Sequence, residues 1–306
     1  GSSALAFKEK AAFYAMQAEK YELAKKYYEE IFSNAGQIEK LNSSKMRLAY
    51  AYTLSKLNLR ADAIAQFRMV LADADKLKTL ASTNLRLVAF NPARQKMLAN
   101  GFLSTLSESF LDKETYLKNR IAVLQGLKGG KDNHFDESSR LTFLIKDYQK
   151  LALLYETNSK PGKMIDAINK SIDLAVEWVK LSGDSVGPVI YRATINYMSL
   201  AISNPNVFKQ GVNKKIAEIY RELHKGFSDY PYPTPVIHFQ LAKLNILWQA
   251  MQRDVYNAGV FEGDAIAADE KVTALEKSAP DKYKELQNLV NYFKGKSNPS
   301  STHLDR

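Results

Sequence analysis

The chain has 306 residues, of which 45% are hydrophobic and 25% charged, with a formal net charge of +10. This composition is that of an ordinary globular protein, and the length allows one large domain or two smaller ones. The absence of cysteine excludes disulfides, thiolate metal sites and cysteine nucleophiles. With only 14 glycines and 9 prolines, helix is favoured over sheet.

The sequence shows no apolar run approaching the ~18 residues that a membrane-spanning helix needs, and no signal peptide. It begins GSSALAF without an initiator Met, so these residues are either a cloning remnant or the start that follows a removed targeting segment or anchor. Membrane association through such a missing anchor stays open. The lack of cysteine favours an exported bacterial protein, periplasmic or membrane-anchored, over a cytoplasmic one.

The first long segment, residues 7–34, has helical periodicity. Its apolar or small side chains recur at spacings of three and four. They are Phe7, Ala11, Ala12, Ala15, Tyr21, Ala24, Tyr28 and Ile31. The pattern ends at Asn34-Ala35-Gly36, which is typical of a helix C-terminus.

The next segment repeats the first at a fixed distance. It predicts a helix over 38–55, a turn near Leu57-Asn58-Leu59 and a second helix over 61–74. Three pairs of positions lie 39 residues apart: Ala12 and Ala51, Ala24 and Ala63, Tyr28 and Phe67. Self-similarity at such a period is typical of a solenoid, in which stacked hairpins bury each other's apolar faces. The alanines mark the places where helices cross closely.

Both segments resemble the tetratricopeptide repeat family, which has a small residue in its first helix and another at the start of its second, followed four residues later by an aromatic. Ala12, Ala24 and Tyr28 hold these places in the first copy, and Ala51, Ala63 and Phe67 in the second. The family's Trp and terminal Pro are missing, and its first-helix Gly is Ala. The spacing of 39 residues exceeds the family's period of about 34, which implies longer helices or an extra turn. The resemblance implies an all-α fold, a right-handed α-α superhelix of antiparallel helix hairpins.

A third hairpin is predicted around residues 151–178. Ala152 and Tyr155 belong to its first helix, and Asn158-Ser159-Lys160-Pro161-Gly162 forms a turn longer than the family pattern. Pro161 suits the start of the second helix. That helix is expected to pack through Ala167, Ile168, Ile172, Leu174 and Ala175.

The rest of the chain is also expected to be helical. The predicted helices are 76–89, 92–108, 112–127, 137–157, 163–182, 187–203, 212–228, 234–252 and 281–295. Gly129-Gly130 is the expected hinge, which divides N-terminal repeats (1–130) from continuing hairpins with a C-terminal capping helix (131–296). A disordered tail is expected at 297–306.

No constellation of reactive groups points to an enzyme, and we expect neither catalytic activity nor a cofactor or metal. His134, within KDNHFDES, lies in a polar turn that matches no calcium loop. His224 lies near a helix C-terminus, His238 beside apolar neighbours, and His303 in the tail. The sequence contains no HExxH, GxSxG, P-loop or GxGxxG motif.

Two other segments have a structural and a functional interpretation. The run DYPYPTPV, residues 229–236, is read as a stiff connection between hairpins, with display of its tyrosines to a partner as the alternative. The acidic FEGDAIAADE, residues 261–270, is read as a solvated loop or weak helix start, with contact to a basic partner as the alternative.

Positive charge is concentrated in the N-terminal part. Residues 1–130 contain 20 Lys and Arg against 12 Asp and Glu, a net of +8. The family resemblance implies that first helices line a concave groove that binds a protein or peptide, here an acidic or carboxylate-bearing one. The residues expected to be exposed in this groove are Lys10, Tyr14, Gln17, Arg47, Tyr50 and Lys56.

Several alternatives stay open. The first alternative is a structural subunit of an envelope-associated complex. Such a subunit would contact its partners through its outer surface, and the helix near 281–295 would fill the groove. An enzyme or small-molecule binder within residues 90–135 is a third reading. Nucleic acid is not expected, because the first helices carry no periodic basic code.

Overall fold

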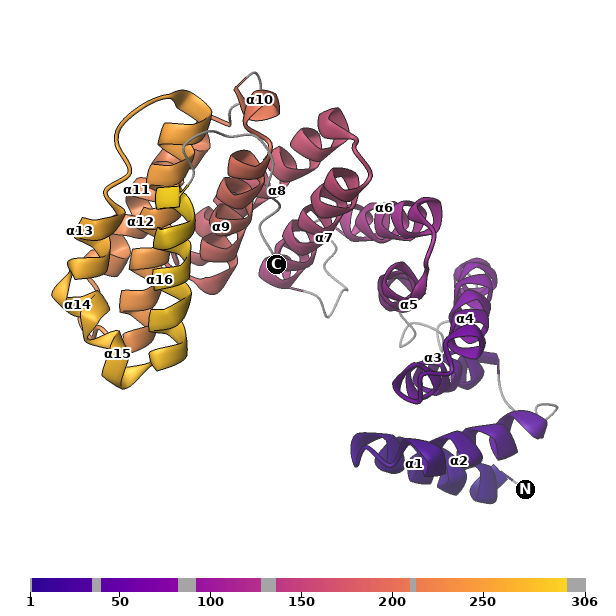
Figure 1. Ribbon diagram of the computed structural model, residues 1–306. Coiled ribbons are helices and arrows are strands. Elements are labelled where there is room, and N and C mark those ends of the chain that lie inside the picture. Colours follow the sequence, from indigo (N-terminus) through magenta and orange to yellow (C-terminus); the bar gives the residue numbers. More distant parts are fainter. Residues whose placement is uncertain (1, 35–39, 82–91, 128–135, 210–212, 296–306) are drawn as a thin grey trace. The chain divides into compact units, whose positions relative to one another are not determined.

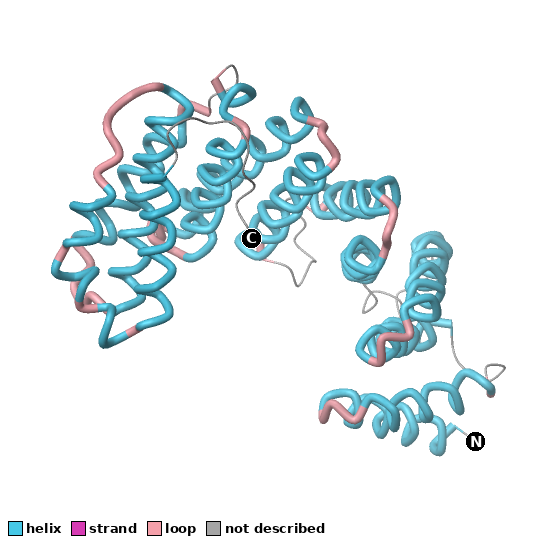
Figure 2. Tube along the Cα trace, in the orientation of Figure 1, coloured by secondary structure: helices cyan, strands magenta, loops and turns pink. Residues whose placement is uncertain are grey.

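A computed structural model describes residues 2–34, 40–81, 92–127, 136–209 and 213–295, and every regular element in these ranges is a helix (Figure 2). The all-α class expected from the scarcity of glycine and proline is thereby confirmed. Consecutive helices pair as antiparallel hairpins, consistent with a helical repeat arrangement. The chain separates into two compact units, residues 1–136 and 137–306.

In its described residues the first unit forms three helix pairs. They follow one another along the chain from α1 to α6 (Figure 1). Each helix packs mainly on its neighbour in sequence, and each pair is joined by a connection of three residues. The helices are α1 (Ser2–Gln17) with α2 (Tyr21–Ser33), α3 (Lys40–Lys56) with α4 (Arg60–Ala81), and α5 (Pro92–Leu106) with α6 (Phe110–Gly126).

The core of the first two hairpins is built from the residues that repeat at 39. Ala12, Ala24, Ala51 and Ala63 are fully buried, and the aromatic positions Tyr28 and Phe67 are 1% and 0% exposed. Small side chains at these points allow close helix packing, and the aromatics fill the space beside them. The predicted helix crossings are confirmed.

The same turn closes both hairpins. Glu19 and Asn58, again 39 residues apart, adopt left-handed backbone conformations with φ of 58° and 59°. The next residue then donates its amide to a carbonyl five positions back: Lys20 to Ala15 at 2.9 Å, and Leu59 to Leu54 at 2.9 Å. This pattern is a Schellman-type helix end, which satisfies carbonyls that the helix itself leaves unpaired.

The described residues of the second unit form ten further helices. Four of them, α7, α9, α12 and α16, contact one another in that order, and Figure 1 shows α16 beside α12. The helices are α7 (Glu137–Thr157), α8 (Pro161–Ser182), α9 (Pro188–Ser203), α10 (Pro205–Phe208), α11 (Lys215–Ser228), α12 (Pro235–Tyr256), α13 (Gly263–Ala268), α14 (Glu270–Thr273), α15 (Leu275–Ser278) and α16 (Pro280–Gly295).

The predicted third hairpin is α7 with α8. Its expected packing residues are buried: Ala152, Tyr155, Ala167, Ile168, Ile172, Leu174 and Ala175. Its turn, however, is not longer than the others, because three residues join the helices here too. Ser159 has φ of 52°, and Lys160 donates to the Tyr155 carbonyl at 2.8 Å. Pro161 and Gly162, which the predicted turn includes, are the first two residues of α8.

When the left-handed turn residues of the three hairpins are aligned, Met164 of α8 stands where the first two hairpins have an alanine in the second helix. The residue five positions after the left-handed one is Ala24, Ala63 or Met164. In each hairpin its amide donates a hydrogen bond to the carbonyl of the residue four positions before it. Met164 is 1% exposed, so a long side chain occupies the place that alanine holds in the first two hairpins.

Other helix predictions differ in detail. The separate helix expected over 76–89 is wrong at its start, because α4 continues without a break to Ala81; residues 82–89 lie outside the described ranges. The short helices α10, α14 and α15 were not predicted. Gly129-Gly130 and the tail 297–306 also lie outside the described residues.

The proline-rich run joins α11 to α12, as predicted. Thr234 caps α12 by accepting a hydrogen bond from the Ile237 amide, and Pro235 is the first helical residue. Tyr232 stays 80% exposed. Within FEGDAIAADE, residues Gly263–Ala268 form α13, and Asp264 pairs with Lys294 of α16 at 2.5 Å.

The helix expected to cap the C-terminal part is α16. It buries Leu286, Val290 and Phe293 within the second unit, where it packs on α12, α13 and α15. Lys243 of α12 pairs with Glu285 at 2.6 Å, and Arg253 donates to the Phe293 carbonyl at 2.9 Å. The helix is therefore part of the core of its unit.

Candidate partner-binding cleft

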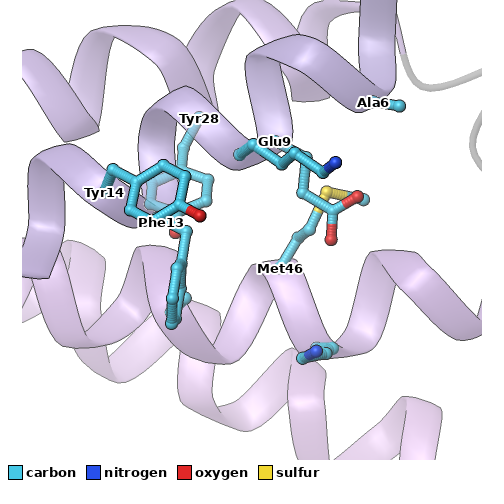
Figure 3. Close-up of a pocket in the computed structure, with 9 residues that line it drawn as sticks. Ala6, Glu9, Phe13, Tyr14, Tyr28 and Met46 are labelled. Carbon is cyan, nitrogen blue, oxygen red and sulfur yellow. The ribbon is translucent and has the colours of Figure 1, made fainter. Parts of the chain in front are cut away.

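A cleft of about 290 Å³ opens in the first unit between α1 and α3, the first helices of two successive hairpins. Figure 3 shows Glu9 of one helix beside the tip of Met46 from the facing helix, with the Phe13 ring directed toward that facing helix. Its lining consists of Ala6, Glu9, Lys10, Phe13 and Tyr14 from α1, Tyr28 from α2, and Lys45, Met46 and Ala49 from α3. We refer to it as the α1/α3 cleft.

The aromatic wall of the cleft follows from the helical period of α1. Ala12 and Ala15 face the core, so the two residues between them are directed away from it. Phe13 and Tyr14 accordingly remain 41% and 65% exposed, with ring centroids 6.1 Å apart in an edge arrangement. Two adjacent exposed aromatics are an apolar surface that a partner side chain can cover.

The charges around the cleft are mainly positive. Lys10 and Lys45 are exposed and line it, and neither forms an ion pair with another described residue. Glu9 is half-buried at its wall. Burial raises the pKa of the Tyr28 phenol to about 12, and the negative charge of Glu9 adds to the shift. The phenol is therefore a neutral hydrogen-bonding group at physiological pH.

Four of the six predicted groove residues are exposed, and two of these line the cleft. Lys10 and Tyr14 are part of its wall, whereas Gln17 ends α1 and Lys56 ends α3 outside it. The Lys56 ammonium lies 5.4 Å from the centroid of the Tyr52 ring. The role of all four in binding stays a prediction.

Arg47 is not an exposed groove residue. Its guanidinium lies 4.8 Å from the centroid of the Phe32 ring in α2 and donates to the Gln66 side chain of α4 at 2.8 Å. Asp73, also in α4, lies 3.7 Å from its Nε atom. Arg47 thus ties α3 to both neighbouring helices, and the prediction that it is exposed is wrong.

Tyr50 is likewise half-buried rather than exposed. Its ring lies 5.8 Å from that of Tyr28 and 5.6 Å from that of Phe32, so it fills the space between α2 and α3. Burial raises the pKa of its phenol to about 12, with a further contribution from Glu29, to which the hydroxyl donates at 3.4 Å. It serves packing between the first two hairpins.

Phe13, Lys45 and Met46 line the cleft but were not predicted. The signal for Phe13 was present, because Phe13 and Tyr14 lie between Ala12 and Ala15 and therefore off the apolar stripe that these alanines mark. Lys45 and Met46 carry no such signal. Their place depends on which face of α3 meets α1, and this is a tertiary contact.

Metal-binding side chains are not clustered in the described part of the structure. No group of three or more His, Asp or Glu side chains there is placed to hold a metal ion. His224 lies 5.7 Å from the Tyr220 ring. His238 is half-buried beside Leu241 and Ala242. Asp132, His134 and His303 lie outside the described residues, whereas Glu137 begins α7 and accepts a hydrogen bond from Arg140 at 2.7 Å.

No family model matches the chain, and neither does any curated protein or solved structure. Within the residues that the structure describes, none of the helices combines the length and apolar character needed to span a bilayer. The function is therefore argued from the geometry of the fold and of the α1/α3 cleft.

Proposed function

We propose that the chain is a non-catalytic scaffold that binds protein segments, built as a right-handed superhelix of the tetratricopeptide type. Support for the repeat comes from three hairpins that share one turn geometry, two of them at a spacing of 39 residues. Repetition of a hairpin with the same turn and the same crossing residues generates a regular stack of first helices. In that family the first helices line the binding groove.

The observation that carries the binding proposal is the α1/α3 cleft. It lies between successive first helices and leaves Phe13 and Tyr14 exposed beside Met46. Exposed adjacent aromatics cost little side-chain entropy when a partner covers them, and such residues are enriched in protein interfaces.

The preferred partner is an acidic segment with at least one apolar side chain. Lys10 and Lys45 stand at the edge of the cleft without an intramolecular acidic partner among the described residues. The net charge of +8 in residues 1–130 extends the positive potential around it. Such a potential attracts an acidic chain and accelerates its association, while the aromatic surface holds the apolar side chain.

A random peptide library displayed on phage and selected against the immobilised full chain tests this function. Selected peptides should be enriched in Asp and Glu around an apolar residue. Their affinity should fall at least tenfold for Tyr14→Ala and for the pair Lys10→Glu with Lys45→Glu. All three side chains are exposed, so these variants should fold.

Lys26→Glu is the matched control, because Lys26 is exposed on α2, does not line the cleft and is not among the predicted groove residues. Its binding should remain within about twofold of the parent chain. Peptides without acidic enrichment, or equal binding by all variants, would overturn the assignment to this cleft. Equal binding would favour the alternative of contacts through the outer surface.

A further inference from the structure

A second cavity lies in the other unit, between α7 and α9. Its volume is about 190 Å³. The lining residues are Ile145, Lys146 and Gln149 from α7, and Pro188, Val189 and Arg192 from α9. The lining contains two cations and no carboxylate, and none of its residues belongs to the α1/α3 cleft.

Gln149 supplies a buried donor to this cavity. Its side chain is 94% buried, and its Oε1 atom accepts a hydrogen bond from Asn196 of α9 at 3.0 Å. That bond holds the amide group against α9 and leaves Nε2 buried without any hydrogen-bond partner. A buried N–H without an acceptor is unfavourable, so a ligand that brings an acceptor oxygen is stabilised here.

Lys146 and Arg192 provide the charge. Both side chains are exposed and line the cavity from opposite helices. Neither forms an ion pair or a hydrogen bond with another described residue, whereas many other cations of the chain are paired. Two unpaired cations facing one cavity repel each other, and a bound anion relieves this repulsion.

The first turn of α9 adds to the positive potential. Pro188 and Val189, its first two residues, line the cavity. The capping residue is Gly187, which has no side chain to accept hydrogen bonds from the first-turn amides. The nearby Asp184 carboxylate accepts from the Val186 amide in the preceding loop and does not line the cavity. Helix N-termini with free amides favour anions.

We propose that this cavity binds a phosphate group. Two full positive charges and a helix N-terminus match a dianion better than a carboxylate, which has a single charge. Arginine offers paired N–H groups, lysine a point charge, and Gln149 a single buried donor, and together they can satisfy the several acceptor oxygens of one phosphate. The ligand is free phosphate or the phosphate of a small monoester.

Isothermal titration calorimetry on the full chain tests the site with inorganic phosphate, O-phosphoserine and acetate at matched ionic strength. Saturable binding is expected for at least one of the phosphate compounds, with acetate at least tenfold weaker. The affinity of inorganic phosphate should be higher at pH 8 than at pH 6, because its second proton leaves between these values. O-phosphoserine, whose second pKa is about 6, should gain less. Tighter binding of O-phosphoserine than of inorganic phosphate would assign the ligand to esters, and the reverse order to the free ion.

Arg192→Gln and Lys146→Gln should each weaken phosphate binding at least tenfold. Both residues are exposed, so the variants should fold, and circular dichroism checks this. Lys170→Gln is the matched control, an exposed lysine of α8 that does not line the cavity. Equal heats for acetate and phosphate, no saturable heat, or unchanged affinity in Arg192→Gln would overturn the proposal.

Discussion

The hairpins α3/α4 and α7/α8 share one turn but solve the helix crossing differently. Both have a left-handed residue followed by an amide bonded five positions back. Five positions after that residue, α4 presents the fully buried Ala63, whereas α8 presents Met164, which is 1% exposed. The same turn is therefore compatible with either a small or a long side chain at this buried position of the second helix.

The largest expected effect comes from removing the long side chain. Met164→Ala should lower the free energy of unfolding of the second unit by about 2–5 kcal/mol, because the buried methylene and thioether groups leave a cavity. Denaturant unfolding combined with hydrogen exchange on the α8 amides measures the loss. A loss below about 1 kcal/mol would contradict this prediction. It would mean that α7 and α8 move together and remove the cavity, so that they pack as closely as α3 and α4 do.

The converse substitution should have a smaller effect. Ala63→Leu should destabilise the first unit by about 1–3 kcal/mol, because the crossing of α3 and α4 has no room for three more carbons. Ala51→Leu on the facing helix provides a second test of the same crossing. Exchange protection of α4 should fall while that of α8 stays unchanged. Unaltered stability in both variants would contradict the close packing described here.

The smallest effect concerns the shared turn. Ser159→Gly should stabilise the second unit by about 0.5–1 kcal/mol, since glycine adopts the left-handed conformation without a side-chain clash. Asn58→Gly is the control and should gain less, because asparagine tolerates that conformation better than serine. Thermal unfolding measures both variants. Destabilisation by Ser159→Gly would show that the turn depends on something other than its backbone conformation.

Much of the fold was predictable because the helical signal is local. The periodicity of apolar residues predicted most of the long helices, and the 39-residue repeat predicted that Ala12, Ala24, Ala51 and Ala63 are buried. The equivalence of Met164 to Ala24 and Ala63 was missed, because the comparison of the hairpin sequences looked for a small residue at this position. An alignment anchored on the turn residues Asn58 and Ser159 would have found it.

The site was less predictable, because exposure depends on neighbours from other helices. Arg47 and Tyr50 lie on α3, but Phe32 of α2 covers part of both, and nothing in their own helix indicates this. The burial of Gln149 likewise depends on Asn196, 47 residues away. A lysine or arginine on a helix face, such as Lys146 or Arg192, looks in sequence like any solvated charge.

The pairing of adjacent helices through three-residue turns bears on how the chain acquires its structure. In the first unit, the main partner of each helix is the next or the preceding helix, so few contacts require distant parts of the chain to meet. Low contact order of this kind is associated with rapid folding. A hairpin such as α1/α2 has all of its own residues available before the second unit is made, so contacts within it can form on the ribosome while the second unit is still being translated.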